Sequence, residues 1–234
     1  MTLTIDVSQD KWGLTEQQRM IRALEIGVND YLVRPIDKQE LLARVNTQIK
    51  RWRYTARLRT SVQQSWELAI TDALTGLFNR RYMETNVAAL VGEAVRSKQD
   101  LAVLLVDIDL FKAINDTHGH DVGDRVLIQL GKRIRASLRA IDLPCRIGGE
   151  EFMIALPDTD VAAACAVAER LRQSVFARPF KGGAKPGPLS LTVSIGVAGL
   201  EGPTDTLGDI LKRADDALYC AKRDGRNRVH ADAA

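Results

Sequence analysis

The sequence predicts an α/β fold in which helices flank a mixed central β-sheet. Patterns typical of strands and helices alternate from residue 80 onward, in the order α-β-α-β-β-α-β-α-β. Residues 101–109 form an almost continuously apolar run, which is typical of a strand covered on both faces. The pair Gly148-Gly149 separates two further apolar runs and indicates a two-residue hairpin turn. A hairpin inside an alternating pattern favours a sheet with parallel and antiparallel neighbours.

The first 70 residues contain fewer regular patterns. Residues 16–26 predict a short helix, and residues 31–33 predict a brief strand. Asp37 followed by Glu40 is a variant of the capping box, so a long helix is expected over residues 41–69. Its apolar residues recur at steps of three and four and form one stripe, which we expect to pair with the same helix of a second copy. The basic run within it is interpreted as a solvated helix face rather than a nucleic-acid contact.

Turn, helix and strand signals follow in order through the rest of the chain. Residues 71–76 have turn composition, and Asn79 is suited to cap the next helix. Helices are predicted over residues 80–95, 126–138, 160–175 and 207–222. Strands are predicted over residues 101–109, 143–147, 150–156, 189–197 and 228–230, of which 189–197 alternates as a half-buried strand does. The segments between them, 110–123 and 181–188, are predicted as loops.

Composition excludes several functional classes. With 33 basic and 30 acidic residues, the net charge of +3 is too small for a protein built as a polycation for DNA. Hydrophobic residues make up 45% and aromatic ones 5%, which indicates a globular protein without a stacking platform for single-stranded nucleic acid. The longest apolar run, residues 101–106, is far shorter than the roughly 20 residues of a membrane span. With no signal-peptide pattern and three cysteines interpreted as reduced thiols, we expect a cytoplasmic protein.

Four carboxylates are the strongest candidates for chemistry. Asp107 and Asp109 stand two residues apart at the end of the apolar strand, so their side chains leave the same face. Buried carboxylates need a cation, which is either an arginine at the edge of the core or a metal ion. Glu150 and Glu151 follow the Gly148-Gly149 turn, and pairing of this hairpin beside the first strand brings Glu150 to Asp107. Such oxygen clusters prefer Mg²⁺, and glycines let a ligand approach the backbone.

The segment after this strand adds side chains that suit a nucleotide. Lys112 can contact a phosphate as a point charge. Asn115 and Asp124 can hydrogen-bond the edge of a purine, although an isolated asparagine is more often a turn residue. His118 and His120 form an H-x-H pattern, but no cysteine or further histidine is nearby, which disfavours zinc.

Five ordered motifs resemble those of one enzyme family. They are TDALTGLFNRR (71–81), DIDLFKAINDTHGHDVGD (107–124), RAIDLPCRIGGEEF (139–152), SIGVA (194–198) and RADDALYCAKRDGRN (213–227). Together they resemble the GGDEF-domain diguanylate cyclases, in the GGEEF variant, over essentially everything after Thr71. The resemblance implies a palm-like, nucleotide-cyclase fold that condenses two GTP into cyclic di-GMP and releases two pyrophosphates. It also implies a homodimer, because one site holds one GTP and the product joins two.

The resemblance assigns roles to individual residues. It implies that Asp107, Glu150 and Glu151 are catalytic, with either glutamate open as the base. It implies a Mg²⁺ or Mn²⁺ site formed by Asp107, Glu150 and the carbonyl of Ile108. The implied substrate contacts are Asn115 and Asp124 with guanine, Lys112, Lys222 and Arg226 with the phosphates, Phe111 beside them and Gly149 beneath the nucleotide.

A separate motif implies inhibition by the product. Arg139 and Asp142 stand before GGEEF at the offset of the family's inhibitory R-x-x-D motif. Arg139 can bind guanine O6 and N7 or a phosphate, and Asp142 can accept from guanine ring N–H groups. Arg170 matches an arginine that, in relatives, contacts the same ligand from a neighbouring domain. The simpler alternative for Arg139 and Asp142 is an ion pair that ends a helix.

Residues 23–45 show a second resemblance, to the last third of a response-regulator receiver domain. The layout resembles receiver-linked cyclases that control cell polarity, with Arg34-Pro35 where active receivers usually have Lys-Pro. We expect a truncated receiver-like segment over residues 1–50, a linker helix over 51–71 and the cyclase domain over 72–234. The stretch that would bear the phospho-acceptor aspartate is absent, so phosphorylation control is not expected. A receptor that binds cyclic di-GMP without making it is the alternative function, and the retained GGEEF acids favour the enzyme.

Overall fold

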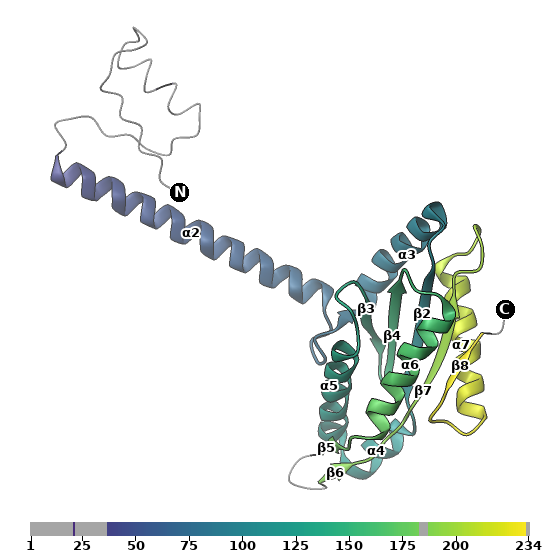
Figure 1. Cartoon of the computed structure of the whole chain (residues 1–234). Coiled ribbons are helices and arrows are strands. Elements are labelled where there is room, and N and C mark those ends of the chain that lie inside the picture. Colours follow the sequence, from purple (N-terminus) through teal and green to yellow (C-terminus); the bar gives the residue numbers. More distant parts are fainter. Residues whose placement is uncertain (1–20, 22–36, 183–186, 233–234) are drawn as a thin grey trace. The chain divides into compact units, whose positions relative to one another are not determined.

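The protein is described by a computed structural model that covers residue 21, residues 37–182 and residues 187–232, except for the side chains of residues 62–67 (Figure 1). Contacts divide the chain into two compact units, Met1–Gln64 and Ser65–Ala234. Ile21 is helical. The rest of the predicted short helix, the strand over residues 31–33 and most of the receiver-like segment lie outside the described residues.

A long helix forms most of the described part of the first unit. Helix α2 (Lys38–Ile70) begins after Asp37, whose Oδ1 accepts hydrogen bonds from the backbone N–H groups of Gln39 and Glu40. The predicted cap and the predicted long helix are therefore confirmed. Apolar side chains of the predicted stripe are exposed within the single chain, with Trp52 at 72%. None of the described helices is both long and apolar enough to cross a bilayer.

The second unit contains a six-stranded mixed sheet, as predicted. Its strand order is β1-β3-β4-β2-β7-β8, with β2 paired antiparallel to β4 and β7. The outer pairs, β1 with β3 and β7 with β8, are parallel. The strands are β1 (Phe78–Asn79), β2 (Leu101–Ile108), β3 (Leu143–Gly148), β4 (Glu151–Pro157), β7 (Val193–Gly199) and β8 (Val229–Ala231). Two short strands, β5 (Phe180–Lys181) and β6 (Pro188–Leu189), pair separately.

Helices cover both faces of this sheet (Figure 1). On one face, α5 (His120–Ala136) and α6 (Val161–Phe176) share a core with Leu104 of β2. On the other face, α3 (Arg80–Ser97) and α7 (Leu207–Arg223) share a core with Val103. Every residue of β2 is buried, as its apolar run predicts, and each buried aliphatic side chain stabilises the fold by roughly 1.5–3 kcal/mol.

Gly196 allows α7 to pack closely against the sheet. A Cβ at Gly196 in β7 would overlap the carbonyl oxygen of Ala214 and the backbone nitrogen of Leu218, both in α7. The helix therefore lies directly on the backbone of β7, so its last turn reaches the end of β2, where Lys222 contacts Asp107. The small residue in this strand is required by the packing of the helix.

The predicted loop over residues 110–123 is wrong. This segment forms α4 (Phe111–His118) and the start of α5, which meet at Gly119 with a φ of +84°. Leu110 also has a positive φ, +57°, and it turns the chain from β2 into α4. Only Phe111 of α4 is buried, so this short helix offers too few apolar positions to show a helical period in the sequence.

The strand predicted over residues 189–197 also differs. β6 ends at Leu189 and β7 begins at Val193, and all seven residues of β7 are buried rather than half-buried. The alternation is misleading because Ser194 is a buried hydrogen-bond donor and Gly196 makes room for α7. Both faces of β7 are therefore covered, although the alternating sequence suggests that one face is exposed.

Candidate active site

The centre of the candidate site is Asp107, near the end of β2. Its buried carboxylate lies 2.8 Å from Lys222 Nζ. Glu151 of β4 lies directly opposite it in the register, whereas the sequence predicted Glu150 there. Burial raises the pKa of Asp107, and the charges of Glu150 and Glu151 add to this rise, against the lowering effect of Lys222. Both glutamates of the hairpin are therefore close enough to act on Asp107.

The hairpin turn is displaced by one residue from its predicted position. A register irregularity between Arg146 and Gly148 pairs Gly148 with Glu151, so Gly149 and Glu150 form the turn. Gly149 has a φ of +53°, a conformation that favours glycine. A Cβ on Gly148 or Gly149 would meet nothing within 4 Å, so a ligand can approach the backbone of the turn.

An arginine that the sequence reasoning missed holds this turn. Arg146 donates from Nε (3.1 Å) and Nη2 (2.8 Å) to the carbonyl of Gly149, and from Nη1 to Asp72 at 3.2 Å. Asp72 also accepts from the backbone and hydroxyl of Thr75. Burial opposes ionisation of Asp72, but these hydrogen bonds and the Arg146 charge leave its pKa lowered. The position of Arg146 two residues before the glycine pair is the signal that could have identified it.

The predicted nucleotide residues gather where α4 meets α5. A Cβ at Gly123 would overlap Oδ1 of Asn115 and would lie 3.1 Å from Cζ of Phe111. Gly123 thus leaves space for the Asn115 amide, and Asp124 follows it directly on α5. Phe111 is buried, while Lys112 and Asp124 are exposed. Asn115 and Asp124, which the sequence assigned to a purine edge, are thus neighbours at the junction of α4 and α5.

Asp107 of β2 and Asp109, just after this strand, have different surroundings. Asp109 was predicted to need a metal ion or an arginine, but its carboxylate accepts hydrogen bonds from the hydroxyls of Thr192 and Ser194 and from the backbone of Asn227. Ser194 lies on β7, the neighbour of β2 in the sheet, Thr192 precedes that strand, and Asn227 follows α7. Arg226, which precedes Asn227, is exposed.

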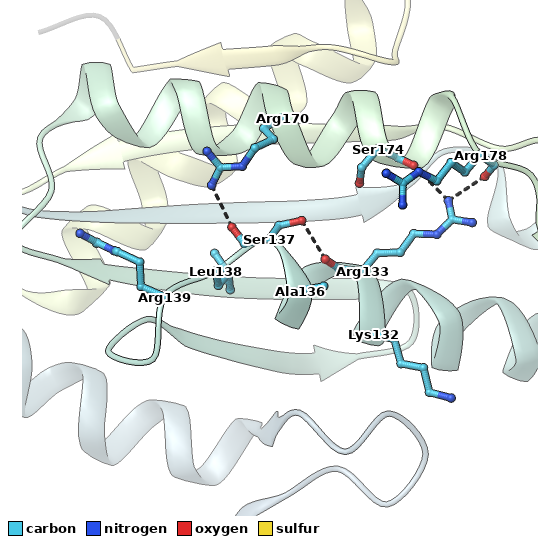
Figure 2. Close-up of a pocket in the computed structure, with 9 residues that line it drawn as sticks. All are labelled: Lys132, Arg133, Ala136, Ser137, Leu138, Arg139, Arg170, Ser174 and Arg178. Carbon is cyan, nitrogen blue, oxygen red and sulfur yellow. Dashed lines mark hydrogen bonds between the residues drawn. The ribbon is translucent and has the colours of Figure 1, made fainter.

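Arg139 and Arg170, two of the three residues predicted to bind the product, line a basic pocket between α5 and α6 (Figure 2), whereas the third, Asp142, does not line it. The pocket has a volume of about 600 Å³, and no acidic residue lines it among those described. Its cationic lining residues are Lys132, Arg133, Arg139, Arg170 and Arg178. Arg170 reaches from α6 to donate to the carbonyl of Ser137 at 2.8 Å (Figure 2). The pocket therefore suits an anionic ligand.

Arg139 and Asp142 also form the ion pair of the simpler alternative. Arg139 Nη2 lies 2.9 Å from Asp142 Oδ1, and the Arg139 backbone N–H donates to the same carboxylate at 2.7 Å. Arg139 Nη2 also contacts Thr159 Oγ1 at 2.7 Å. The Asp142 side chain is 2% exposed, whereas that of Arg139 is 52% exposed. The arginine is thus held through its Nε and Nη2 atoms, while about half of its side chain stays exposed to solvent.

The donor atoms around Asp107 fit a hard divalent cation. In the described part of the chain, no three His, Cys, Asp or Glu side chains form a metal-binding group. The predicted set needs only two carboxylates, Asp107 and Glu150, with the carbonyl of Ile108. Mg²⁺ commonly takes one or two carboxylates from the protein and its other ligands from substrate phosphates and water. The oxygen-only donor set is therefore compatible with Mg²⁺ or Mn²⁺.

Comparison with known proteins places this site in a family. A family model described as "Diguanylate cyclase, GGDEF domain" matches residues 69–228. The response regulator PleD of Caulobacter vibrioides is 52% identical over 219 residues, which are 94% of this chain and 48% of PleD. Diguanylate cyclase A of Treponema denticola is 40% identical over 169 residues, 71% of this chain and 45% of that protein. The chain thus spans about half the length of these curated relatives.

A solved structure shows the same fold. The coiled coil and GGDEF domain of DgcB from Caulobacter crescentus, in complex with c-di-GMP, superposes with a TM-score of 0.72 at 32% identity. The superposition covers 82% of this chain and 98% of that one. The likeness confirms the palm-type architecture that the motifs predicted. The chain belongs to the GGDEF-domain diguanylate cyclase family.

Proposed function

We propose that this chain is a diguanylate cyclase, which joins two GTP into cyclic di-GMP and releases two pyrophosphates. The observation that carries the proposal is the group of Asp107, Glu150 and Glu151 beside an open glycine turn. Relatives named as diguanylate cyclases support it. The alternative, a cyclic di-GMP receptor without synthesis, is disfavoured because the chain retains all three acids.

The substrate contacts follow from the surroundings of Asp107. Asn115, with its amide in the space left by Gly123, and the neighbouring Asp124 bind the guanine edge. Lys112, Lys222 and Arg226 bind the phosphates, since all three are cations that solvent can reach. Phe111 packs beside the phosphates, and Gly149 lets the nucleotide lie against the turn.

The catalytic acids have two roles: they hold a metal ion, and one of them accepts a proton. Asp107, Glu150 and the Ile108 carbonyl would hold Mg²⁺ or Mn²⁺, which supplies charge neutralisation at the phosphate and favours ionisation of the attacking hydroxyl. Glu150 or Glu151 accepts the proton of the 3′-hydroxyl. Lys222 balances one of the three negative charges while it contacts Asp107. Positioning and electrostatics supply most of the rate, as in phosphoryl transfer generally.

Assembly and regulation complete the proposal. Because each site holds one GTP, two copies face each other as a homodimer. The apolar stripe of α2, exposed in the single chain, is the surface that pairs them. Cyclic di-GMP then binds through Arg139 and Arg170, which line the basic pocket, and through Asp142, which contacts Arg139, and it inhibits by holding the two GTP sites apart.

Incubation with GTP and Mg²⁺, with the nucleotides resolved by chromatography, tests this function. We expect cyclic di-GMP to accumulate and then to slow its own synthesis. If the folded chain binds cyclic di-GMP but forms none from GTP, the chain is a receptor and not an enzyme. A chain that binds neither nucleotide would contradict both functions.

A further inference from the structure

Asp109 is a buried carboxylate that the proposed mechanism does not use. It is 7% exposed, and it accepts from Thr192 Oγ1 (2.6 Å), Ser194 Oγ (2.7 Å) and the Asn227 backbone N–H (3.1 Å). Among the described residues, no lysine or arginine forms an ion pair with it. A buried charge is costly unless it is hydrogen-bonded, so these three donors and the carboxylate fix one another.

The segment that Asp109 holds has an unfavourable backbone conformation. Gly225, Arg226 and Asn227 have φ values of +111°, +62° and +49°. Residues with a Cβ avoid this region, and two in succession persist only where the surroundings impose the conformation. Backbone of this kind is concentrated at functional sites.

A second residue, Arg172, holds Asn227 through its side chain. Arg172 of α6 donates from Nη1 to Asn227 Oδ1 at 2.7 Å. Glu169 fixes the same guanidinium through contacts of 2.6 and 2.8 Å. The backbone N–H of Asn227 is thus held by Asp109, just after β2, and its side chain is held by Arg172 of α6. Arg226, adjacent to this anchored residue, is left exposed to solvent.

We propose that Asp109 and Arg172 are positioning residues for GTP binding. By holding Asn227 from two sides, they maintain the left-handed segment that presents Arg226 to the triphosphate. The inference rests on the proposed function, in which Arg226 contacts the phosphates. Neither residue touches the substrate in this account.

The test measures binding of 3′-deoxy-GTP, which lacks the attacking hydroxyl, by calorimetry on the full chain with Mg²⁺. Arg172→Met should raise the Kd about tenfold, because a charge-assisted hydrogen bond that fixes the segment is lost. Asn227→Gly removes the same contact but accepts the left-handed conformation freely, so Arg172→Met should add less than about twofold in that background. Arg223→Met is the matched control, since this exposed arginine contacts Asp224 beside the segment. It should leave the Kd unchanged.

Turnover separates positioning from catalysis. At saturating GTP the kcat of Arg172→Met should stay within about twofold of the parent while KM rises, as expected for lost binding. Asp109→Asn, which keeps one acceptor oxygen, should weaken binding less than Asp109→Ser. Parental affinity in a folded Arg172→Met chain, or an equal loss in Arg223→Met, would overturn this inference and leave the proposed function intact. A parent chain that does not bind 3′-deoxy-GTP would overturn both.

Discussion

The acidic cluster at the end of β2 and the basic pocket between α5 and α6 leave charges of opposite sign without a partner. In the described residues, the cluster has three carboxylates and one paired cation, Lys222. The pocket is lined by five cations and no acid, and one of the five, Arg139, is paired with Asp142 outside the lining. Uncompensated charge is unfavourable in the free protein, and a ligand of opposite charge relieves it. From this contrast we expect the cluster to bind a cation and the pocket to bind an anion.

Two other acids are each paired with an arginine inside the fold. Asp72 is held by Arg146 and Thr75, and Asp142 is held by Arg139. The pKa of Asp72 is lowered, whereas that of Asp107 is raised. We therefore assign Asp72 to the support of the hairpin turn and Asp107 to ligand binding.

Removal of one charge from the acidic cluster should have the largest effect. Glu150→Gln keeps the size of the side chain but loses a proposed metal ligand, so we expect the rate of synthesis to fall about 100-fold or more. The melting temperature and binding of cyclic di-GMP at the basic pocket should not change. Undiminished synthesis by the folded variant would exclude Glu150 from the mechanism.

Removal of one charge from the basic pocket should affect regulation instead. Arg139→Ala should weaken binding of cyclic di-GMP about tenfold or more, because a planar, charged donor is lost. Its initial rate should match the parent, and its progress curve should continue where the parent slows. Arg96→Ala, an exposed arginine on α3, is the control. If parent and variant bind product equally and stall at the same concentration, the inhibitory site lies elsewhere.

Two glycine-to-alanine substitutions test the geometry of the nucleotide site, and we expect a smaller effect on activity. Gly123→Ala displaces the Asn115 amide, so we expect KM for GTP to rise several-fold, by about 1 kcal/mol of binding. Gly202→Ala, in the segment between β7 and α7, meets nothing within 4 Å and should leave KM unchanged. The added alanine favours helix α5, which limits the loss of stability in Gly123→Ala. Equal KM values for the two variants would contradict the placement of Asn115.

The smallest effect is expected at Asp72, an acid that is paired with an arginine. Asp72→Asn removes the ion pair with Arg146 and should lower the free energy of unfolding by about 1 kcal/mol at neutral pH. Because the pKa of Asp72 is lowered on folding, its contribution is present above the ordinary value of 3.8 and is lost as the pH falls through the folded value. Urea unfolding of parent and variant should therefore differ by a constant amount down to about pH 5 and converge only at lower pH. A difference that disappears near neutral pH would show that the pair contributes nothing.

Sequence reasoning predicted the mixed sheet and the buried strand that contains Asp107, because both depend on local patterns of apolar residues. It failed where partners are distant along the chain. Thr192 is 83 residues from Asp109, and Arg146 is 74 residues from Asp72, so neither contact leaves a local signal. Helix α4 was missed because one buried residue, Phe111, cannot display a period. The hairpin turn was misplaced by one residue because a strand irregularity before Gly148 shifts the pairing.

The central claim is that two copies of this site combine two GTP molecules. The most direct test measures cyclic di-GMP and pyrophosphate formed from GTP and Mg²⁺ over a range of enzyme concentrations, alongside sedimentation of the same samples. We expect two pyrophosphates for each cyclic di-GMP and a specific activity that rises with concentration as dimers form. Full specific activity in samples that sediment as monomers would contradict the account.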